Sequence, residues 1–336
     1  MLFEEIVGNE SAKKYLEKII LSKSVANTLL FTGPDGVGKS LFALVLAEKM
    51  MYPEGFEENA KKKIMSGNHP DLHIFRPEGK TEMHSIASMR KLIDEVFLPP
   101  FEAEAKVFIL HDAERMLPSS ANAILKTLEE PTLDSYIILL SSQSDDILPT
   151  ILSRCMKINF SRLTDEEVSF VLKEKRGKTT QEAKYFSTLS LGSVGRAMHL
   201  SLCPYHEEKK KILLDILSMK GGLFYGDLQE KLKRLEEILE KEKIDDASIS
   251  YGHKEAEVIF SQVMMWMRDL HLLKMKGDRR HLFFSDNLSL LLSVDLFSLI
   301  DLEEVQQAIE DTRLGFKRNM KFKTCLEQLF LKILPI

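Results

Sequence analysis

A glycine-rich turn near the N-terminus constrains the fold more than any other stretch of this 336-residue sequence. It reads GPDGVGKS over residues 33–40, directly after the apolar run TLLF at residues 28–31. The next residues, SLFALVLAEKMM, have helical periodicity. A GxxxxGK[ST] turn between a strand and a helix is the setting in which backbone N–H groups converge on phosphate oxygens. The sequence therefore predicts a phosphate loop; the alternative is a glycine-rich turn that binds nothing.

The residue types in this loop suit a nucleotide. Its glycines let the backbone approach phosphate without Cβ clashes, and the helix that follows adds its positive N-terminal end. Lys39 can reach the β- and γ-phosphates, and the Ser40 hydroxyl can bind Mg²⁺. We expect ATP or ADP with Mg²⁺ to be held by Gly33, Pro34, Asp35, Gly36, Val37, Gly38, Lys39 and Ser40.

Apolar runs alternate with helical segments after this loop. Residues 107–110 and 136–140 read as strands, and residues 121–130 read as a helix that Pro131 stops. Strands that alternate with helices imply a parallel sheet covered on both faces. We predict an α/β domain over residues 1–160.

The remainder is predicted to be all-α. Capping boxes begin at Thr164 and Thr179, and Ser193 is placed to cap a third helix, which together predict a small helical domain over residues 161–206. Residues 207–336 keep helical periodicity, with a helix capped by Asp227 and amphipathic segments at 255–274 and 302–334. The expected fold class is α/β plus all-α.

Composition and cysteine usage narrow the function classes. A net charge of −5 does not indicate a strongly basic nucleic-acid binder, although a local basic surface stays open. The three cysteines are widely spaced, which argues against a disulfide framework and for a reducing compartment. The N-terminus does not read as a signal peptide, and Asp295 and Asp301 interrupt the longest leucine-rich run. We expect a cytoplasmic protein without a membrane contact.

Five stretches resemble one family when read in order: FEEIVGNESAKKYL, LLFTGPDGVGKSLFALVLAEKM, NHPDLHIFRPEGK, SANAILKTLEEPT and ILPTILSRC. They resemble the bacterial DNA polymerase III clamp-loader subunits of the AAA+ class, most of all the delta-prime branch and next the gamma/tau branch. WMRDLHLLK and NMKFKTCLEQLFLKIL extend the likeness to the C-terminus.

The resemblance implies an AAA+ RecA-like domain, a three-helix lid over residues 161–206 and a helical collar over residues 207–336. Five such arms form an open ring that loads a sliding clamp onto primed DNA. The implied partners are gamma/tau and delta subunits, the clamp, and DNA held mainly through its backbone.

The resemblance also assigns roles to residues outside the phosphate loop. Arg154 of the SRC motif points into a neighbour's ATP site, for which its planar, permanently charged guanidinium is suited. Val7 and Gly8 cover the adenine, and Ser141 or Ser142 senses the γ-phosphate. The alternatives are a surface arginine, a structural turn and a strand-end serine that caps a turn.

Two further features depart from the family pattern. Arg196 falls one residue later than the family's lid arginine, a rotation of about 100° on a helix, so nucleotide contact and a role without it both stay open. The family often carries four zinc-binding cysteines between the phosphate loop and the next strand, whereas residues 51–79 contain none. His69, His73 and His84 lack ligand spacing and are expected to be solvated loop residues. We predict no zinc.

The strand at residues 107–110 ends in HDAER, where a hydrolase of this family carries an adjacent Asp-Glu pair. Counting back from ANAILKTLEEP puts His111 at the metal-binding position and Asp112 at the water-activating one. In a register shifted by one residue, Asp112 binds the metal and Ala113 takes the other position, with Glu114 turned back from the strand end as a further possibility. Mg²⁺ prefers oxygen ligands, so His111 is a poor substitute. Alternatively Ser40 and waters hold the metal and the change is harmless.

Two functions follow. The first is a non-hydrolysing, delta-prime-like subunit of the DNA polymerase III holoenzyme that binds nucleotide with little or no turnover and donates Arg154 to a neighbour. The second is an active ATPase motor, gamma-like or an unrelated phosphate-loop enzyme. The HDAER segment, the missing cysteines and the end of the sequence directly after the collar favour the first.

Overall fold

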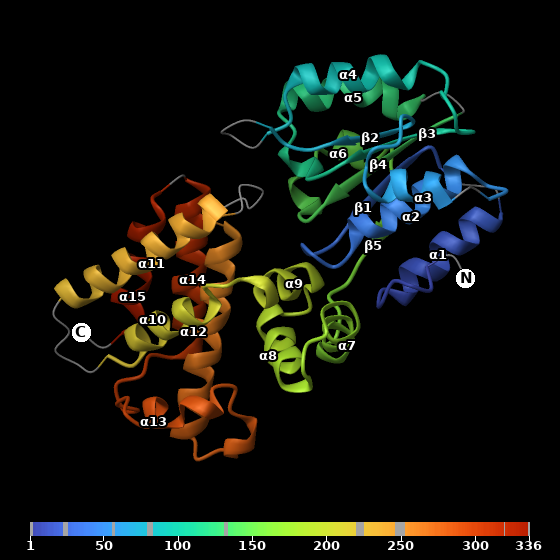
Figure 1. Ribbon diagram of the computed structural model, residues 1–336. Coiled ribbons are helices and arrows are strands. Elements are labelled where there is room, and N and C mark those ends of the chain that lie inside the picture. The colour runs from blue at the N-terminus through green and yellow to red at the C-terminus, as the bar shows by residue number, and fades with distance from the viewer. Residues whose placement is uncertain are drawn as a thin grey trace. The chain divides into compact units, whose positions relative to one another are not determined.

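The computed structural model describes residues 3–22, 26–55, 58–78, 83–130, 134–219, 225–245, 253–318 and 320–334. The chain forms two compact units, Met1–Met198 and His199–Ile336, here called the sheet unit and the helical unit (Figure 1). The predicted combination of an α/β part and an all-α part is confirmed.

A parallel sheet forms the centre of the sheet unit. Within the described residues its order is β2-β3-β4-β1-β5. The register places Leu29 of β1 opposite Ile138 of β4 and Met156 of β5. The strands are β1 (Thr28–Thr32), β2 (Leu72–Phe75), β3 (Lys106–Leu110), β4 (Ser135–Ser141) and β5 (Met156–Asn159).

Helices cover both faces of this sheet, as Figure 1 shows. On one face α4 (Ile86–Val96), α5 (Pro118–Glu129) and α6 (Pro149–Leu152) pack on alternate strand residues such as Leu30, Phe108 and Leu139. The other face carries α1 (Glu10–Leu21), α2 (Lys39–Met51) and α3 (Glu58–Met65). Central strands buried on both faces need continuous apolar sequence, and every residue of β1 and β3 is buried.

The three predicted strands are confirmed, whereas β2 and β5 are missing from the sequence prediction. These two strands are four residues long and form the edges of the sheet. An edge strand is only partly buried, so its sequence carries a weaker apolar signal. The helix predicted at 121–130 begins earlier, at Pro118, because proline suits the first helical position. Pro131 lies outside the described residues.

The predicted caps of the next three helices are confirmed. They are α7 (Asp165–Arg176), α8 (Thr180–Ser190) and α9 (Val194–Leu202). Thr164 and Thr179 each form a capping box, and Ser193 Oγ accepts the N–H of Arg196 at 3.2 Å. The division into domains 1–160, 161–206 and 207–336 stays a prediction.

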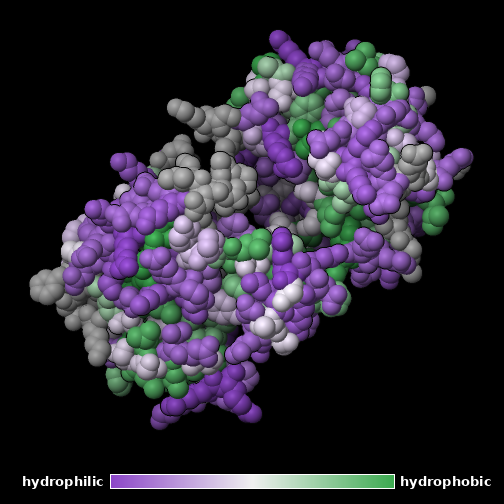
Figure 2. Space-filling view, in the orientation of Figure 1, coloured by the Kyte–Doolittle hydropathy of each residue, from purple (hydrophilic) through white to green (hydrophobic). Residues whose placement is uncertain are grey.

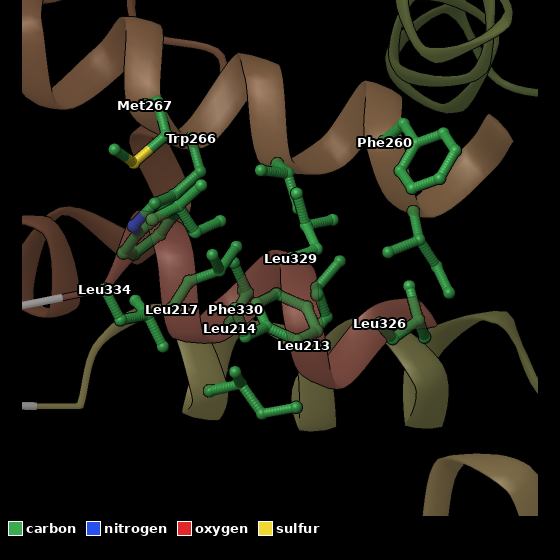
Figure 3. Packing of buried hydrophobic residues seen from close by; sticks show 14 of the residues in the cluster. Leu213, Leu214, Leu217, Phe260, Trp266, Met267, Leu326, Leu329, Phe330 and Leu334 are labelled. Atoms are coloured by element: carbon green, nitrogen blue, oxygen red, sulfur yellow. The ribbon is translucent and has the colours of Figure 1, made fainter. Parts of the chain in front are cut away.

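The helical unit is built around a single tryptophan. Trp266 of α12 (His253–Lys274) is fully buried among leucines from α10 (His206–Leu217) and α15 (Phe322–Ile333), as Figure 3 shows. The unit also contains α11 (Tyr225–Asp245), α13 (Leu288–Leu291) and α14 (Leu302–Lys317). Short 3₁₀ turns lie at Ala113–Arg115 and Ser144–Asp146 in the sheet unit, and at Arg279–His281 and Ser285–Asn287 in the helical unit.

Two helix predictions in this unit are wrong in detail. Asp227 does not cap α11, because the helix already begins at Tyr225 and Asp227 lies in its first turn, where a negative charge is also favourable. The segment predicted over 302–334 is two helices, since the chain turns between them, with the N–H of Met320 donating to the carbonyl of Gly315 at 3.1 Å.

The expectation that His69, His73 and His84 are solvated is wrong. His69 and His84 are buried, and His73 stacks on Phe108 with ring centroids 4.9 Å apart. His73 belongs to β2, and Nδ1 of His69 accepts the N–H of Asp71 at 3.1 Å. Among the described residues no group of three or more His, Cys, Asp or Glu side chains is placed to hold a metal, and the absence of zinc stays a prediction.

The surface shown in Figure 2 is mostly hydrophilic, with hydrophobic side chains in scattered patches. No helix in the described part of the chain combines the length and the apolar character needed to cross a membrane.

A buried carboxylate fixes the loop between α4 and β3. Asp71 is fully buried and accepts the N–H groups of Phe101, Glu102 and Ala103 at 2.6, 2.8 and 2.9 Å. Burial alone raises the pKa of Asp71, but the three donors outweigh it, so its pKa lies below the ordinary value.

Asp71→Asn is expected to destabilise the sheet unit by about 2–4 kcal/mol, because the amide directs N–H groups at N–H groups. The contribution of the ionised carboxylate is complete at neutral pH and is lost as the pH falls below about 4, since the folded pKa is the lower one. Urea unfolding followed by circular dichroism should show the shift, whereas the fluorescence of Trp266, in the helical unit, should keep its transition. The exposed Asp94→Asn is the control; equal effects of the two variants would contradict the role of Asp71.

Candidate functional site

The carboxyl edge of the sheet collects most of the candidate residues. The phosphate loop (residues 33–40) follows β1, the segment 111–115 follows β3, and Ser141 ends β4 with Ser142 directly after it. Carboxyl ends of parallel strands meet at one edge, which is where open α/β sheets bind ligands. The N–H of Gly33 donates to the carbonyl of Ser141 at 3.2 Å, so the loop and the serine turn are in direct contact.

The phosphate loop leads directly into the first turn of α2. Its last two residues, Lys39 and Ser40, begin α2, and Lys39 Nζ donates to the carbonyls of Gly33 and Pro34 at 2.6 and 2.8 Å. Burial lowers the pKa of Lys39, while the nearby Asp35 and two acids of segment 111–115 oppose that shift. Ser40 is exposed in the first turn of α2. The lysine, the helix N-terminus and the exposed hydroxyl fit a nucleotide phosphate with Mg²⁺.

The loop also touches the start of α9. Gly36 has φ 73°, and its carbonyl accepts the N–H of Gly195 at 2.9 Å. A Cβ on Gly36 would lie 2.2 Å from Ser193 Oγ, so the approach depends on glycine. Arg196 follows in the same turn and is half-buried. Its contact with nucleotide stays a prediction.

The N-terminal segment joins this junction through a residue that the sequence reasoning missed. Asn9 directly follows Val7 and Gly8, and its side-chain amide donates to the carbonyls of Val37 and Ser161 at 3.4 and 3.3 Å. Its Oδ1 accepts the N–H of Ser161 at 2.7 Å. The sequence feature that could have identified Asn9 is its position in VGNES, directly after the predicted residues Val7 and Gly8. Whether Val7 and Gly8 cover an adenine stays a prediction.

Glu114 turns back toward the site. The Oε1 of Glu114 accepts both the N–H and the hydroxyl of Ser142, at 3.0 and 2.6 Å. Asp112 takes a left-handed conformation with φ 48°, and the following 3₁₀ turn brings Glu114 round. Asp112 and Glu114 both act on the charge of Lys39, yet Ala113 separates them. Together with Asp35, these are the three acids whose charges act on Lys39.

His111 is an uncharged group in this setting. Burial, followed by the charge of Arg76, lowers its pKa to about 4. Its Nδ1 lies 3.3 Å from Nη1 of Arg76, and its carbonyl accepts a bond from His84 Nε2 at 2.6 Å. A neutral imidazole beside an arginine offers no negative charge to Mg²⁺. Ser141 Oγ accepts the N–H of Gln143 at 3.1 Å, which is the turn-capping alternative for that serine.

Arg154 lies at the amino edge of the sheet, where the parallel strands begin. It precedes β5, whose first residue, Met156, lies opposite Leu29 near the start of β1. The phosphate loop leaves the far end of that five-residue strand, about 13 Å farther along. The structure therefore does not bring Arg154 to the phosphate loop of its own chain.

Comparison with known proteins gives consistent similarities. The family model described as "DNA polymerase III, delta subunit" matches residues 8–164. The chain is 30% identical over 226 residues to "DNA polymerase III subunit delta'" of Bacillus subtilis (strain 168), covering 65% of this chain and 68% of that protein. It is 31% identical over 172 residues to "DNA polymerase III subunit tau" of the same organism, covering 49% of this chain and 30% of that one.

A solved structure is similar over nearly the whole chain. It is a DNA polymerase III, gamma subunit-related protein from Thermotoga maritima, 20% identical, with a TM-score of 0.41. The match covers 94% of this chain and 97% of that one.

Gly36→Ala is expected to destabilise the sheet unit by about 1–3 kcal/mol more than Gly177→Ala, because the new methyl overpacks the junction with α9. Gly177 is the matched control, since it has a similar φ of 61° and no atom within 4 Å of the position that a methyl group would take. Circular dichroism during urea unfolding measures both, and binding of a fluorescent ADP analogue should be lost in Gly36→Ala alone. Equal costs would contradict the close approach.

Proposed function

Because the chain belongs to the family of DNA polymerase III clamp-loader subunits, we propose that it acts as a delta-prime-like subunit. In this role it binds ATP or ADP with little or no turnover and donates Arg154 to the ATP site of a neighbouring subunit. The complex uses that site to load a sliding clamp onto primed DNA.

The placement of Arg154 is the observation that carries this proposal. The arginine and the phosphate loop occupy opposite edges of the sheet, beyond the reach of one side chain. The Arg154 side chain keeps 31% of its surface exposed, so a second molecule can reach it. A guanidinium suits a γ-phosphate because its charge is permanent and its N–H groups form a planar fork. These facts support use of Arg154 in trans.

The chain's own site supports binding more strongly than hydrolysis. Residues 33–40 would hold the phosphates, with Lys39 as the cation and Ser40 as an Mg²⁺ ligand; the bound metal would supply positive charge beside the phosphates. Hydrolysis further needs one acid for the metal and one for the attacking water. Here His111 is neutral, and Glu114 is bonded to Ser142. Losing this arrangement slows phosphoryl transfer, which depends on position and charge.

The similar proteins suggest the partners. Since they are named as delta' and tau subunits of DNA polymerase III, we propose gamma/tau and delta subunits as neighbours of this chain. The sliding clamp and primed DNA are the further partners. Any DNA contact is expected to be to the backbone and to weaken with salt.

An active ATPase motor is the second candidate. The observation in its favour is Glu114, whose Oε2 is buried and has no hydrogen-bond partner within the described part of the chain. A carboxylate oxygen in that state is available to orient a water. Turnover by the isolated chain separates the two candidates.

The isolated chain is expected to bind nucleotide and to hydrolyse ATP at a rate close to background. Lys39→Ala should weaken binding of a fluorescent ADP analogue about tenfold or more, because the site loses its charge-assisted bonds to phosphate. Lys49→Ala, on the exposed side of the same helix, is the control and should bind normally. Robust turnover that Lys39→Ala abolishes would favour the motor.

Arg154→Ala is expected to leave nucleotide binding by this chain intact and to slow the neighbouring site of the reconstituted complex about 10³-fold or more, the usual worth of an arginine finger. Steady-state ATPase of the complex with clamp and primed DNA measures this. Arg176→Ala, at the exposed end of α7, is the control. Full turnover by the Arg154→Ala complex would remove the donated-arginine role.

A further inference from the structure

Arg154 is held by its own chain. Its Nε donates to Glu129 Oε1 at 2.6 Å, and Nη2 forms an ion pair with the same oxygen. Its Nη1 donates to the carbonyl of Thr150 at 2.8 Å and to Ser153 Oγ at 3.2 Å. Four of the five N–H groups of a guanidinium are thus directed at the chain itself.

These contacts occupy both edges with which an arginine grips an anion. The Nε–Nη2 edge, which binds carboxylates and phosphates bidentately, is taken by Glu129. The opposite edge is bound through Nη1 to Thr150 within α6 and to Ser153, which directly follows that helix. A phosphate therefore cannot be gripped bidentately until one set of contacts is exchanged. Glu129 is the anionic member of the set, so it competes directly with phosphate oxygens.

The pair is also weak enough to open. The Arg154 and Glu129 side chains keep 31% and 47% of their surface exposed. Ion pairs at such positions contribute little, since water screens both charges. Glu129 is the last residue of α5, and Arg154 follows α6, so the two groups come from separate segments packed on the same face of the sheet.

We propose that Glu129 is a latch for Arg154. The carboxylate of Glu129 holds the guanidinium of Arg154 against its own chain. The guanidinium leaves Glu129 when a neighbouring subunit with bound nucleotide brings phosphate oxygens within reach. This inference rests on the proposed donation of Arg154. It adds a residue that acts through Arg154 and makes the donation conditional on the neighbour's ligand.

The first test uses the isolated full-length chain. Phenylglyoxal modifies free guanidinium groups, and mass spectrometry of the peptide gives the rate at Arg154. Glu129→Gln should raise this rate about twofold to fivefold, the range that breaking an exposed ion pair allows. Glu130→Gln removes the same charge one position along and should leave the rate unchanged. An unchanged rate in Glu129→Gln would overturn the latch.

The second test uses the reconstituted complex with clamp and primed DNA. At subsaturating concentrations of this chain, Glu129→Gln should raise ATP turnover about twofold to fivefold by the same reasoning, and Glu129→Asp should give a smaller increase. The double variant with Arg154→Ala should match Arg154→Ala alone. If Glu129→Gln slows turnover or leaves it unchanged while Arg154→Ala slows it, the latch is wrong and the donated arginine stands. If Arg154→Ala has no effect, the proposed function and the latch both fail.

Discussion

The site depends on how closely the backbone of the phosphate loop passes neighbouring segments of the chain. A Cβ on Gly33 would lie 2.2 Å from the carbonyl oxygen of Phe160, and one on Gly36 would lie 2.2 Å from Ser193 Oγ. Two missing side chains therefore let the end of β5 and the start of α9 meet the loop. Phe160 is itself fixed, because its ring packs on Phe31 of β1 and Phe42 of α2 at centroid distances of 5.1 and 5.0 Å. The loop's shape is thus set by the sheet below it and the helices beside it.

Three acids and one neutral histidine lie near Lys39 at the carboxyl edge. The charge of Lys39 is opposed by Asp112 and Glu114, which lie on either side of Ala113 in the sequence. The left-handed turn at Asp112 sends Glu114 to Ser142, where both the backbone and the hydroxyl hold it. His111 stays neutral beside Arg76. The carboxyl edge therefore combines the lysine of the phosphate loop with acids that are separated in the sequence and with a neutral imidazole.

The loop, the central strands and the helix caps could be predicted from sequence because each rests on local chemistry. A GxxxxGKS turn, an apolar run and a Thr-x-x-Glu box form within a few residues. The misses depend on distant segments. The edge strands β2 and β5 exist because β3 and β1 offer them partners. Buried His69 bonds through Nε2 to the hydroxyl of Tyr52, 17 residues away, and the side-chain amide of Asn9 donates to the carbonyl of Ser161, 152 residues away. The turn of Glu114 likewise depends on Ser142, which is 28 residues distant.

The carboxyl and amino edges of the sheet hold separate groups of side chains. A change in the residues of one edge therefore leaves the residues of the other edge in place. Changes in segment 111–115 act at the carboxyl edge, whereas Arg154 is positioned by Glu129, Thr150 and the start of β5 at the amino edge. The 12-residue helix α5 connects the two, with a length of about 18 Å. A substitution beside Asp112 therefore alters the chemistry of the chain's own site without displacing the arginine. Under the proposed function the phosphate loop and Arg154 are both needed, and the fold allows the acids of segment 111–115 to change independently of Arg154.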